Sequence, residues 1–363
     1  MDIIHPRFKL NGISITYHDL YEVGYSLIKE GEPYQVTLGG FILDWIDKED
    51  FITVKTSGST GTPKNIRLGK QHMVNSALAT GDYFDLYEGD KALLCLPGDY
   101  IAGKMMLVRA MVLGLDLDWV PPSSDPLRFL DHCYDFCAMV PVQLENSLDR
   151  VNHIKTLIVG GAPLSEDLKT KVQDKTTNIF ETYGMTETIT HIAVRKVNQD
   201  RGVSSNKERD HFTTLPNITI EKDERDCLVI NAPDLDAAPI VTNDIVDLIS
   251  DNEFELLGRY DNIINSGGIK LVPEQIERKL APILKGRFFV TGIPDTEFGQ
   301  KVTLIVEGKP RKAGLLEGIK ALEGLGKYEV PRAIVYIPKF VEVQNGKVSR
   351  KDTLATIKSL DRE

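Results

Sequence analysis

The fold is decided by the stretch KTLIVGGAPLSEDLKTKVQDKTTNIFETYG, residues 155–184. A short apolar run (155–161) ends in two glycines, and a helical pattern follows with Ser165 as its expected N-cap. A second apolar run (178–184) closes the stretch. Strand, helix and strand in this order predict neighbouring parallel strands in a helix-covered sheet. Because the apolar runs are continuous rather than alternating, we expect strands buried on both faces.

The same texture extends towards the N-terminus. Further short apolar runs at 51–57, 91–98 and 135–141 each end in Gly, Pro or Ser, and KMMLVRAMVLG (104–114) has a helical pattern. We therefore expect all of these runs to join one mostly parallel sheet. The structure of the first 40 residues does not follow from their sequence.

The pattern changes after residue 195. A polar stretch, 196–210, predicts a loop, residues 218–233 read as a hairpin, and residues 240–259 read as a second strand pair. A tail of about 100 residues then has strands and helices of its own, with Pro273 in a helix first turn. The predicted fold is an α/β large N-terminal domain, in which helices cover a parallel sheet and a β-rich subdomain is attached, followed by a small mobile α+β C-terminal domain.

Composition limits the function classes. The 363 residues carry a net charge of −10, which disfavours binding to nucleic acid. Neither a signal peptide nor an apolar window of 18 residues is recognisable, so we expect a cytoplasmic protein without a membrane span. The four cysteines form no CxxC pair and predict buried thiols in a reducing compartment. The sequence contains no HExxH motif, so we do not expect a zinc site of that type.

Residues 56–64, TSGSTGTPK, follow an apolar run and combine glycines, hydroxyl side chains and Lys64. Such a loop suits phosphate, because its backbone N–H groups and hydroxyls donate and the lysine adds charge. It is neither a Walker A motif, which needs a glycine where Pro63 stands, nor a G-x-G-x-x-G loop. A flexible Ser/Thr/Gly linker is the alternative interpretation.

Six stretches in order resemble the signature motifs of the adenylate-forming superfamily, in its acyl-CoA synthetase branch. They are TSGSTGTPK (56–64), GGAPLS (160–165), ETYGMTET (181–188), TNDIVDL (242–248), LLGRYDNIINSGGIKLVPEQIE (256–277) and VQNGKVSRKD (343–352). The resemblance covers nearly all of 50–352. The chain is shorter than most members, and we expect the front of the large domain to be abbreviated to about 50 residues.

The resemblance implies a nucleotide site in which Tyr183 stacks on adenine, Thr186 contacts the α-phosphate and Glu187 holds Mg²⁺. Asp244 would bind the ribose, although Asn243 replaces the usual glycine of that motif. The implied nucleotide-binding set is Thr56, Ser57, Gly58, Ser59, Thr60, Gly61, Gly161, Ala162, Pro163, Tyr183, Gly184, Met185, Asp244 and Arg259.

The resemblance also implies a lid. Residues 1–258 would form the ATP- and acyl-binding adenylation domain, 259–262 a hinge pivoting at Asp261, and 263–363 the lid domain. Lys347 would be the catalytic lysine delivered by the lid, and Lys64 would hold the leaving pyrophosphate.

The implied activity is that of an ATP-dependent acid–CoA ligase. A substrate carboxylate attacks the α-phosphorus of ATP, pyrophosphate leaves, and coenzyme A then takes the acyl group as a thioester. Thr186, Glu187, Lys64 and Lys347 would be the catalytic residues. ATP, Mg²⁺, coenzyme A and a small carboxylic acid are the expected ligands.

The short chain and LPGDYIAGKMMLVRAM (96–111) resemble the o-succinylbenzoate–CoA ligases of menaquinone biosynthesis. Tyr100 would border the acyl site, and Lys104, Arg109 and His191 are candidates for a second substrate carboxylate. Two alternatives stay open: an adenylating enzyme that loads a carrier-protein thiol, and a non-catalytic nucleotide-binding protein.

Overall fold

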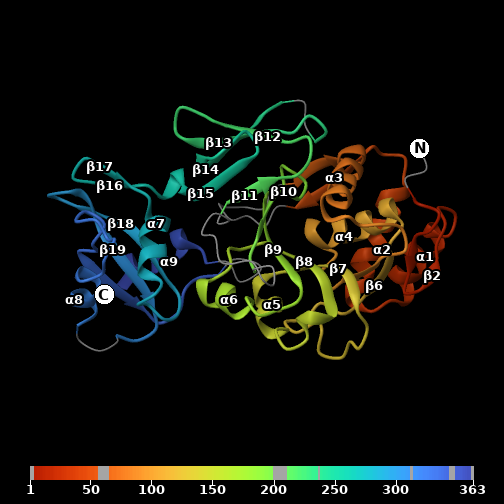
Figure 1. The fold of residues 1–363 in the computed structure, drawn as a ribbon, viewed down its shortest axis with the longest axis horizontal. Coiled ribbons are helices and arrows are strands. Elements are labelled where there is room, and N and C mark those ends of the chain that lie inside the picture. Colours follow the sequence, from red (N-terminus) through yellow and green to blue (C-terminus); the bar gives the residue numbers. More distant parts are fainter. Residues whose placement is uncertain are drawn as a thin grey trace.

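The computed structural model describes residues 4–55, 65–198, 211–235, 238–310, 314–342 and 348–360. Within them, a thirteen-stranded sheet forms the larger lobe and a five-stranded sheet the smaller one (Figure 1). The large sheet runs in the order β12-β13-β14-β15-β11-β10-β9-β8-β7-β5-β6-β1-β2. The predicted α/β architecture with a β-rich part and a smaller α+β part is confirmed.

One half of the large sheet is parallel. Its strands are β1 (Lys9–Leu10), β6 (Asp116–Trp119), β5 (Lys91–Leu94), β7 (Tyr134–Met139), β8 (Ile154–Val159) and β9 (Asn178–Gly184). Successive residues point to opposite faces, so Phe136 joins one hydrophobic cluster and Cys137 the other. Both faces are therefore buried, as the continuous apolar runs predict.

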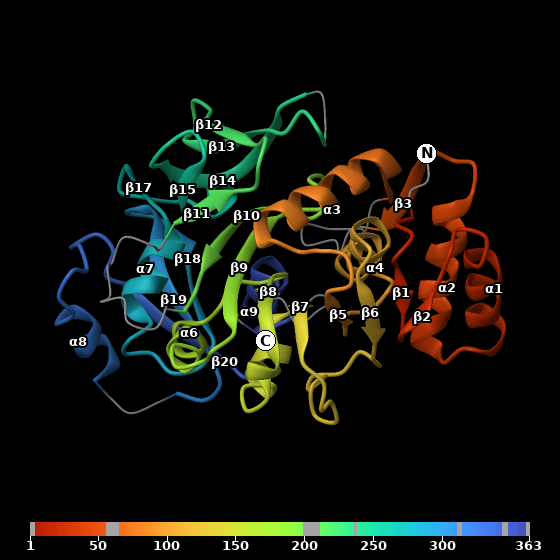
Figure 2. The ribbon, with the colours of Figure 1, turned by 45° about the vertical axis from the view of Figure 1, so that its right-hand side comes forward.

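Helices cover the two faces of this parallel half (Figure 2). One face packs against α3 (Lys70–Phe84) and α4 (Ile101–Leu113), and the other against α5 (Pro141–Asn146) and α6 (Glu166–Lys171). Met105 and Met106 of α4 are fully buried in the first cluster, and Leu144 and Leu168 lie in the second. The predicted helix after residue 103 thus begins slightly earlier, at Ile101.

The other half is antiparallel and corresponds to the predicted β-rich part. It contains β10 (His191–Lys196), β11 (Phe212–Thr214), β12 (Thr219–Lys222), β13 (Cys227–Asn231), β14 (Ile240–Leu248) and β15 (Glu253–Arg259). β12 pairs with β13 and β14 with β15, which confirms both predicted hairpins. The predicted loop at 196–210 lies mostly outside the described residues.

The N-terminal region adds a small layer. β1 pairs with β2 (Ile13–Ser14), and the helices α1 (Leu20–Glu30) and α2 (Pro33–Ile46) pack against each other beside the large sheet (Figure 2). Trp45 of α2 is 2% exposed and lies in the main core.

The run at 51–57 does not join the large sheet, and that expectation is wrong. β3 (Phe51–Lys55) pairs antiparallel with β4 (Asn65–Gly69) in a separate two-stranded sheet. β4 returns only nine residues after β3, and so short a connection permits antiparallel pairing but not a parallel crossover. The sequence NIRLG is too polar to mark a strand by itself.

The smaller lobe is built on the second sheet. Its strands are β16 (Ile264–Ser266), β17 (Ile269–Leu271), β18 (Phe288–Asp295), β19 (Gly299–Glu307) and β20 (Ala333–Ile337), and its helices are α7 (Pro273–Leu280), α8 (Leu315–Lys320) and α9 (Arg350–Leu360). Pro273 occupies the first turn of α7 as predicted. Arg278 of α7 reaches back to Glu255 of β15, with N–O distance 2.8 Å.

The structure also bears on the expectations about membrane spans and about the cysteines. In the described part of the chain, no helix has the length and apolarity to cross a bilayer. Cys95, Cys137 and Cys227 are buried, but Cys133 is exposed, so the expectation of four buried thiols is wrong for Cys133. Cys133 lies just before β7, outside the strand.

The N-cap of α6 gives a stability prediction. Ser165 Oγ accepts the backbone N–H of Leu168 at 3.2 Å, which satisfies one of the free donors at the helix start. We expect Ser165→Ala to lower the free energy of unfolding by about 1 kcal/mol. Chemical denaturation measures this. Ser26→Ala in the exposed part of α1 is the control, and equal unfolding midpoints for both variants would contradict the prediction.

Candidate functional site

Polar loops gather at one edge of the large sheet. Since β5, β7, β8 and β9 are parallel, the segments that follow them begin at the same edge (Figure 1). Tyr100 and Lys104 follow β5, the turn at 160–165 follows β8, and the turn at 185–190 follows β9. Ligand sites in open α/β sheets lie at the carboxyl ends of the strands. This edge is therefore the candidate site.

A largely buried ion pair fixes one of these loops. Glu181 of β9 faces Arg195 of β10 across the antiparallel pairing, with Oε2 2.6 Å from the guanidinium. The other carboxylate oxygen accepts the N–H of Leu164 at 3.1 Å, which ties down the turn at 160–165. The sequence analysis singled out neither Glu181, which lies in the predicted strand at 178–184, nor Arg195, for which no strand was predicted.

Glycines shape the first turn. Gly161 has φ of +85°, a conformation that side chains rarely adopt. A Cβ on Gly160 would lie 2.3 Å from Thr182 Oγ1, so the turn packs directly on β9. Gly161 and Pro163 are exposed, while Leu164 anchors the turn in the core. These exposed groups are available to a ligand at the sheet edge.

The turn at 185–190 is held from inside. The Thr188 side chain is fully buried, and its hydroxyl accepts the Met185 N–H and lies 2.7 Å from the carbonyl of Thr190. Ile189 has φ of +68°, which is an outlier for a β-branched residue and indicates local strain. Thr186 is half-buried and Glu187 is exposed. The turn presents these two side chains while its own backbone is fixed.

Three residues of the expected nucleotide set are in contact. The Tyr183 hydroxyl donates to Asp244 Oδ2 at 2.6 Å, and Arg259 lies 3.2 Å from Asp244 Oδ1. Tyr183 is 8% exposed and Asp244 6%, whereas the Arg259 side chain is 46% exposed. Burial and the Asp244 carboxylate raise the pKa of Tyr183 far above its usual value, so the hydroxyl remains a donor.

The expected hinge residue adjoins this group. Asp261 lies in the 3-10 turn Tyr260–Asn262, where Asn243 donates to its Oδ2 at 3.3 Å and Arg259 lies 3.5 Å from the same oxygen. Asn243, which replaces the family's usual glycine, also accepts from Arg225 at 2.9 Å. The amide thus links the strand that carries Asp244 to the turn between the two sheets.

Arg109 is a buried cation whose hydrogen-bond partners among the described residues are neutral. It is 1% exposed, and its guanidinium bonds to Thr80 Oγ1 at 3.3 Å and to Thr190 Oγ1 at 3.2 Å. A second neighbour is His191 Nδ1 at 3.4 Å. Burial lowers the pKa of Arg109 to about 10. Among the described residues, no carboxylate forms an ion pair with Arg109, and such a buried charge is costly unless a partner arrives.

His191 is buried beside Arg109. Its Nε2 has no hydrogen-bond partner among the described residues, and it lines a cavity of about 20 Å³ with Asn75 and Asp234. Burial and the neighbouring Arg109 charge lower the pKa of His191 well below that of a free imidazole. The side chain is therefore neutral at pH 7.

Lys104 lies on another side of α4 from Arg109. Its ammonium donates to the Gly98 carbonyl at 2.5 Å and sits over the ring of Phe41 in α2. Burial lowers the pKa of Lys104, while the carboxylates of Asp99 and Asp44 oppose that shift. Tyr100, at the N-cap of α4, is half-buried. The structure thus separates Lys104 and Tyr100 from the Arg109–His191 pair.

Part of the predicted site lies outside the described residues. This applies to the whole 56–64 loop, including Thr56, Ser57, Gly58, Ser59, Thr60, Gly61 and Lys64, and to Lys347. The roles of these residues stay predictions.

The residues present fit one magnesium ion bound together with phosphate. No group of three or more His, Cys, Asp or Glu side chains able to hold a metal occurs in the part of the chain that the structure describes. Mg²⁺ does not need one, because it is usually held by one or two carboxylates, water and substrate phosphates. Glu187 offers an exposed carboxylate at the sheet edge.

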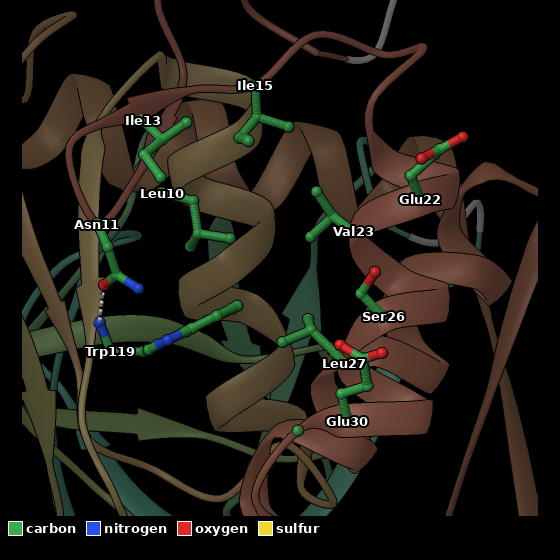
Figure 3. A pocket seen from close by; sticks show the side chains of 11 residues that line it. Leu10, Asn11, Ile13, Ile15, Glu22, Val23, Ser26, Leu27, Glu30 and Trp119 are labelled. Atoms are coloured by element: carbon green, nitrogen blue, oxygen red, sulfur yellow. Dashed lines mark hydrogen bonds between the residues drawn. The ribbon is translucent and has the colours of Figure 1, made fainter.

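An open cavity of about 460 Å³ lies away from this edge (Figure 3). The β1–β2 region contributes Leu10 and Ile15, α1 contributes Val23 and Leu27, and Trp119 closes the floor. None of the predicted site residues lines it. The candidate site therefore rests on the chemistry at the strand ends rather than on the volume of a cavity.

Comparison with known proteins identifies the family of the chain. A family model described as AMP-binding enzyme matches residues 14–219, which is more than half of the chain. The chain belongs to the AMP-binding enzyme family. Its matched region contains the 160–165 and 185–190 turns and both strands that carry Glu181 and Arg195.

Two relatives of this AMP-binding enzyme are both named 2-succinylbenzoate–CoA ligase. The 2-succinylbenzoate–CoA ligase of Lactococcus lactis is 25% identical over 352 residues, which cover 91% of this chain and 76% of that protein. That of Escherichia coli K12 is 25% identical over 321 residues, covering 82% of this chain and 66% of that protein.

Solved structures show the same fold. An acyl-CoA synthetase (AMP-forming)/AMP-acid ligase II-like protein from Dyadobacter fermentans has a TM-score of 0.60 and 33% identity, with 93% of this chain and 98% of that chain covered. The structure of O-succinylbenzoate coenzyme A synthetase from Bacillus subtilis, in complex with ATP and magnesium ion, has a TM-score of 0.71 and 21% identity. The match covers 83% of this chain and 69% of that chain.

The buried histidine predicts a pH dependence of stability. Because the folded protein holds His191 neutral, the unfolded chain binds one more proton below its pKa of about 6.5, and stability falls as pH falls. Between pH 7 and pH 5.5, the parent should lose about 1 kcal/mol more unfolding free energy than His191→Gln.

Denaturant unfolding at the two pH values measures this difference. His18→Gln, at an exposed position, is the control and should follow the parent. The same acid sensitivity in the parent and in His191→Gln would show that His191 is not held neutral.

Proposed function

We propose that the protein is an AMP-forming acid–CoA ligase that acts on 2-succinylbenzoate in the cytoplasm, as a step of menaquinone biosynthesis. The single observation that supports this most is the fully buried Arg109 guanidinium beside the turn at 185–190. It has no carboxylate partner among the described residues. Membership of the AMP-binding enzyme family and the names of the relatives support the reaction class.

The first half-reaction joins two anions, because a carboxylate must approach the α-phosphate of ATP. Glu187 and Thr186 would stand at the phosphates, with the 56–64 loop and Lys64 on the outer phosphates and Lys347 delivered by residues 263–363. Mg²⁺, held by Glu187 and the phosphates, would supply charge neutralisation when bound. The substrate carboxylate is itself the nucleophile, so orientation and fixed charge account for the catalysis.

The second half-reaction would follow a rotation of the smaller lobe about Asp261. The 3-10 turn at 260–262 is the last segment before the second sheet begins at Ile264, which suits a pivot. Coenzyme A would then attack the acyl-adenylate and release AMP.

Arg109 provides the reason for choosing a dicarboxylate. A substrate with one carboxylate at the α-phosphate and a second one beside Arg109 would supply the missing counter-charge. Lys104 is a weaker candidate, because Asp99 and Asp44 already lie near its ammonium. The neutral His191 could orient the same carboxylate through its ring.

The test of the reaction class is pyrophosphate release from ATP with a panel of carboxylic acids, with and without coenzyme A. We expect release with 2-succinylbenzoate and a thioester when coenzyme A is present. Release without any thioester on coenzyme A would favour a carrier-protein thiol as acceptor. No release with any acid would contradict the enzymatic function.

Arg109→Met tests the substrate class. We expect kcat/KM for 2-succinylbenzoate to fall about 30-fold or more, because a buried ion pair with the substrate is lost. Benzoate, which lacks the second carboxylate, should show a much smaller loss. Lys104→Met is the matched control and should leave the ratio of the two acids unchanged. An equal loss for both acids in Arg109→Met would contradict the assignment.

A further inference from the structure

The contact between Tyr183 and Asp244 spans an unusual distance in the sheet order. Tyr183 lies on β9 and Asp244 on β14, with β10, β11 and β15 between them. Four strand spacings in a flat sheet would separate them by roughly 19 Å. The observed O–O distance is 2.6 Å, so the sheet must curl between β9 and β14 until these two side chains meet.

The Tyr183 ring fills the interior of the curl. It packs edge-on against Phe254 of β15, with ring centroids 5.2 Å apart, and against Phe212 of β11 at 5.9 Å. Phe254 is fully buried. Packing of this kind holds the ring, and hence the direction in which its hydroxyl points, without any contribution from Asp244.

The Asp244 carboxylate is held on two sides. Its Oδ2 accepts from the Tyr183 hydroxyl inside the curl, and its Oδ1 faces the half-exposed Arg259 at 3.2 Å. The backbone N–H of Asp244 bonds to Thr242 Oγ1 at 3.0 Å. The terminal torsion of aspartate is otherwise loosely defined, so these contacts set the plane of the carboxylate. Of the two side chains that hold its oxygens, only Tyr183 is buried.

We propose that Tyr183 is a positioning residue whose hydroxyl orients Asp244 to accept hydrogen bonds from the ribose hydroxyls of ATP. This rests on the proposed function, in which Asp244 binds the ribose. Each carboxylate oxygen has about two acceptor sites, so both oxygens retain room for a sugar hydroxyl after their present contacts. The inference concerns only the Tyr183 hydroxyl. It is separate from any contact between the Tyr183 ring and the adenine base.

Tyr183→Phe isolates this role, because it keeps the packed ring and removes only the hydroxyl. The measurement is the dissociation constant of ATP, and of 2′-deoxy-ATP and 3′-deoxy-ATP, by calorimetry with Mg²⁺ present. We expect the parent to prefer ATP, and Tyr183→Phe to bind ATP about 10-fold more weakly while its affinity for the deoxynucleotides changes less than about 3-fold. The preference for a complete ribose should therefore largely disappear.

A matched control exists on the same sheet. The Tyr134 hydroxyl of β7 donates to Asp118 Oδ2 of β6 at 3.1 Å, away from the candidate site. Tyr134→Phe removes the same type of bond and should leave all three dissociation constants unchanged. Thermal unfolding of both variants checks that each is folded at the temperature of the assay.

Asp244→Ala separates the two levels of the proposal. If Asp244→Ala still prefers ATP to the deoxynucleotides, Asp244 does not bind ribose and the proposed assignment of that site fails. If Asp244→Ala loses the preference but Tyr183→Phe keeps it, the positioning role is wrong while the site stands. If Tyr183→Phe weakened the binding of all three nucleotides equally, the hydroxyl would have a purely structural role. That result would also overturn the inference.

Discussion

The arrangement of the large lobe depends on the buried ion pair between Glu181 and Arg195. The pair lies where the parallel half of the sheet meets the antiparallel half, on β9 and β10. A charge pair this deeply buried is compensated only when further hydrogen bonds satisfy the carboxylate, and the Leu164 N–H provides one. One interaction therefore joins both halves of the sheet and fixes the turn at 160–165 at their common edge.

The geometry of the candidate site follows from this junction. The parallel half ends its strands at one edge and presents Thr186 and Glu187 on a strained turn. The antiparallel half curls back and brings Asp244 to Tyr183. Under the proposed function, phosphate would be bound from the parallel half and ribose from the antiparallel half, on opposite sides of the β9–β10 junction.

Much of the fold could be predicted from local patterns. The apolar runs gave the parallel strands, Ser165 and Pro273 marked helix starts, and alternating segments gave both hairpins. The error at residues 51–57 has a physical reason: an apolar run shows that a strand is buried but not which strand pairs with it. The first 40 residues were not predicted. Their helices meet through close backbone contacts, as between Gly24 and Gly39, which a glycine in a sequence does not reveal. The buried side chains Leu38, Phe41, Ile42 and Trp45 of α2 do follow helical spacing, a signal that the sequence analysis did not use.

The site was predictable only where motifs are contiguous. The order of the motifs identified Tyr183, Asp244 and Arg259, and the structure brings these three into contact. The buried partners could not be predicted. An isolated sequence does not show that Arg109 meets His191 and Thr190 across 81 residues or more, because that contact depends on how α4 packs near the start of β10.

The two tryptophans lie at one end of the molecule. Trp45 is buried in α2 and Trp119 ends β6, so the last 244 residues contain none. Tryptophan fluorescence will therefore report melting of the N-terminal layer and the adjoining strand β6, and no tryptophan lies in the smaller lobe to report a rotation. An optical signal for that rotation requires an indole or dye introduced beyond residue 263.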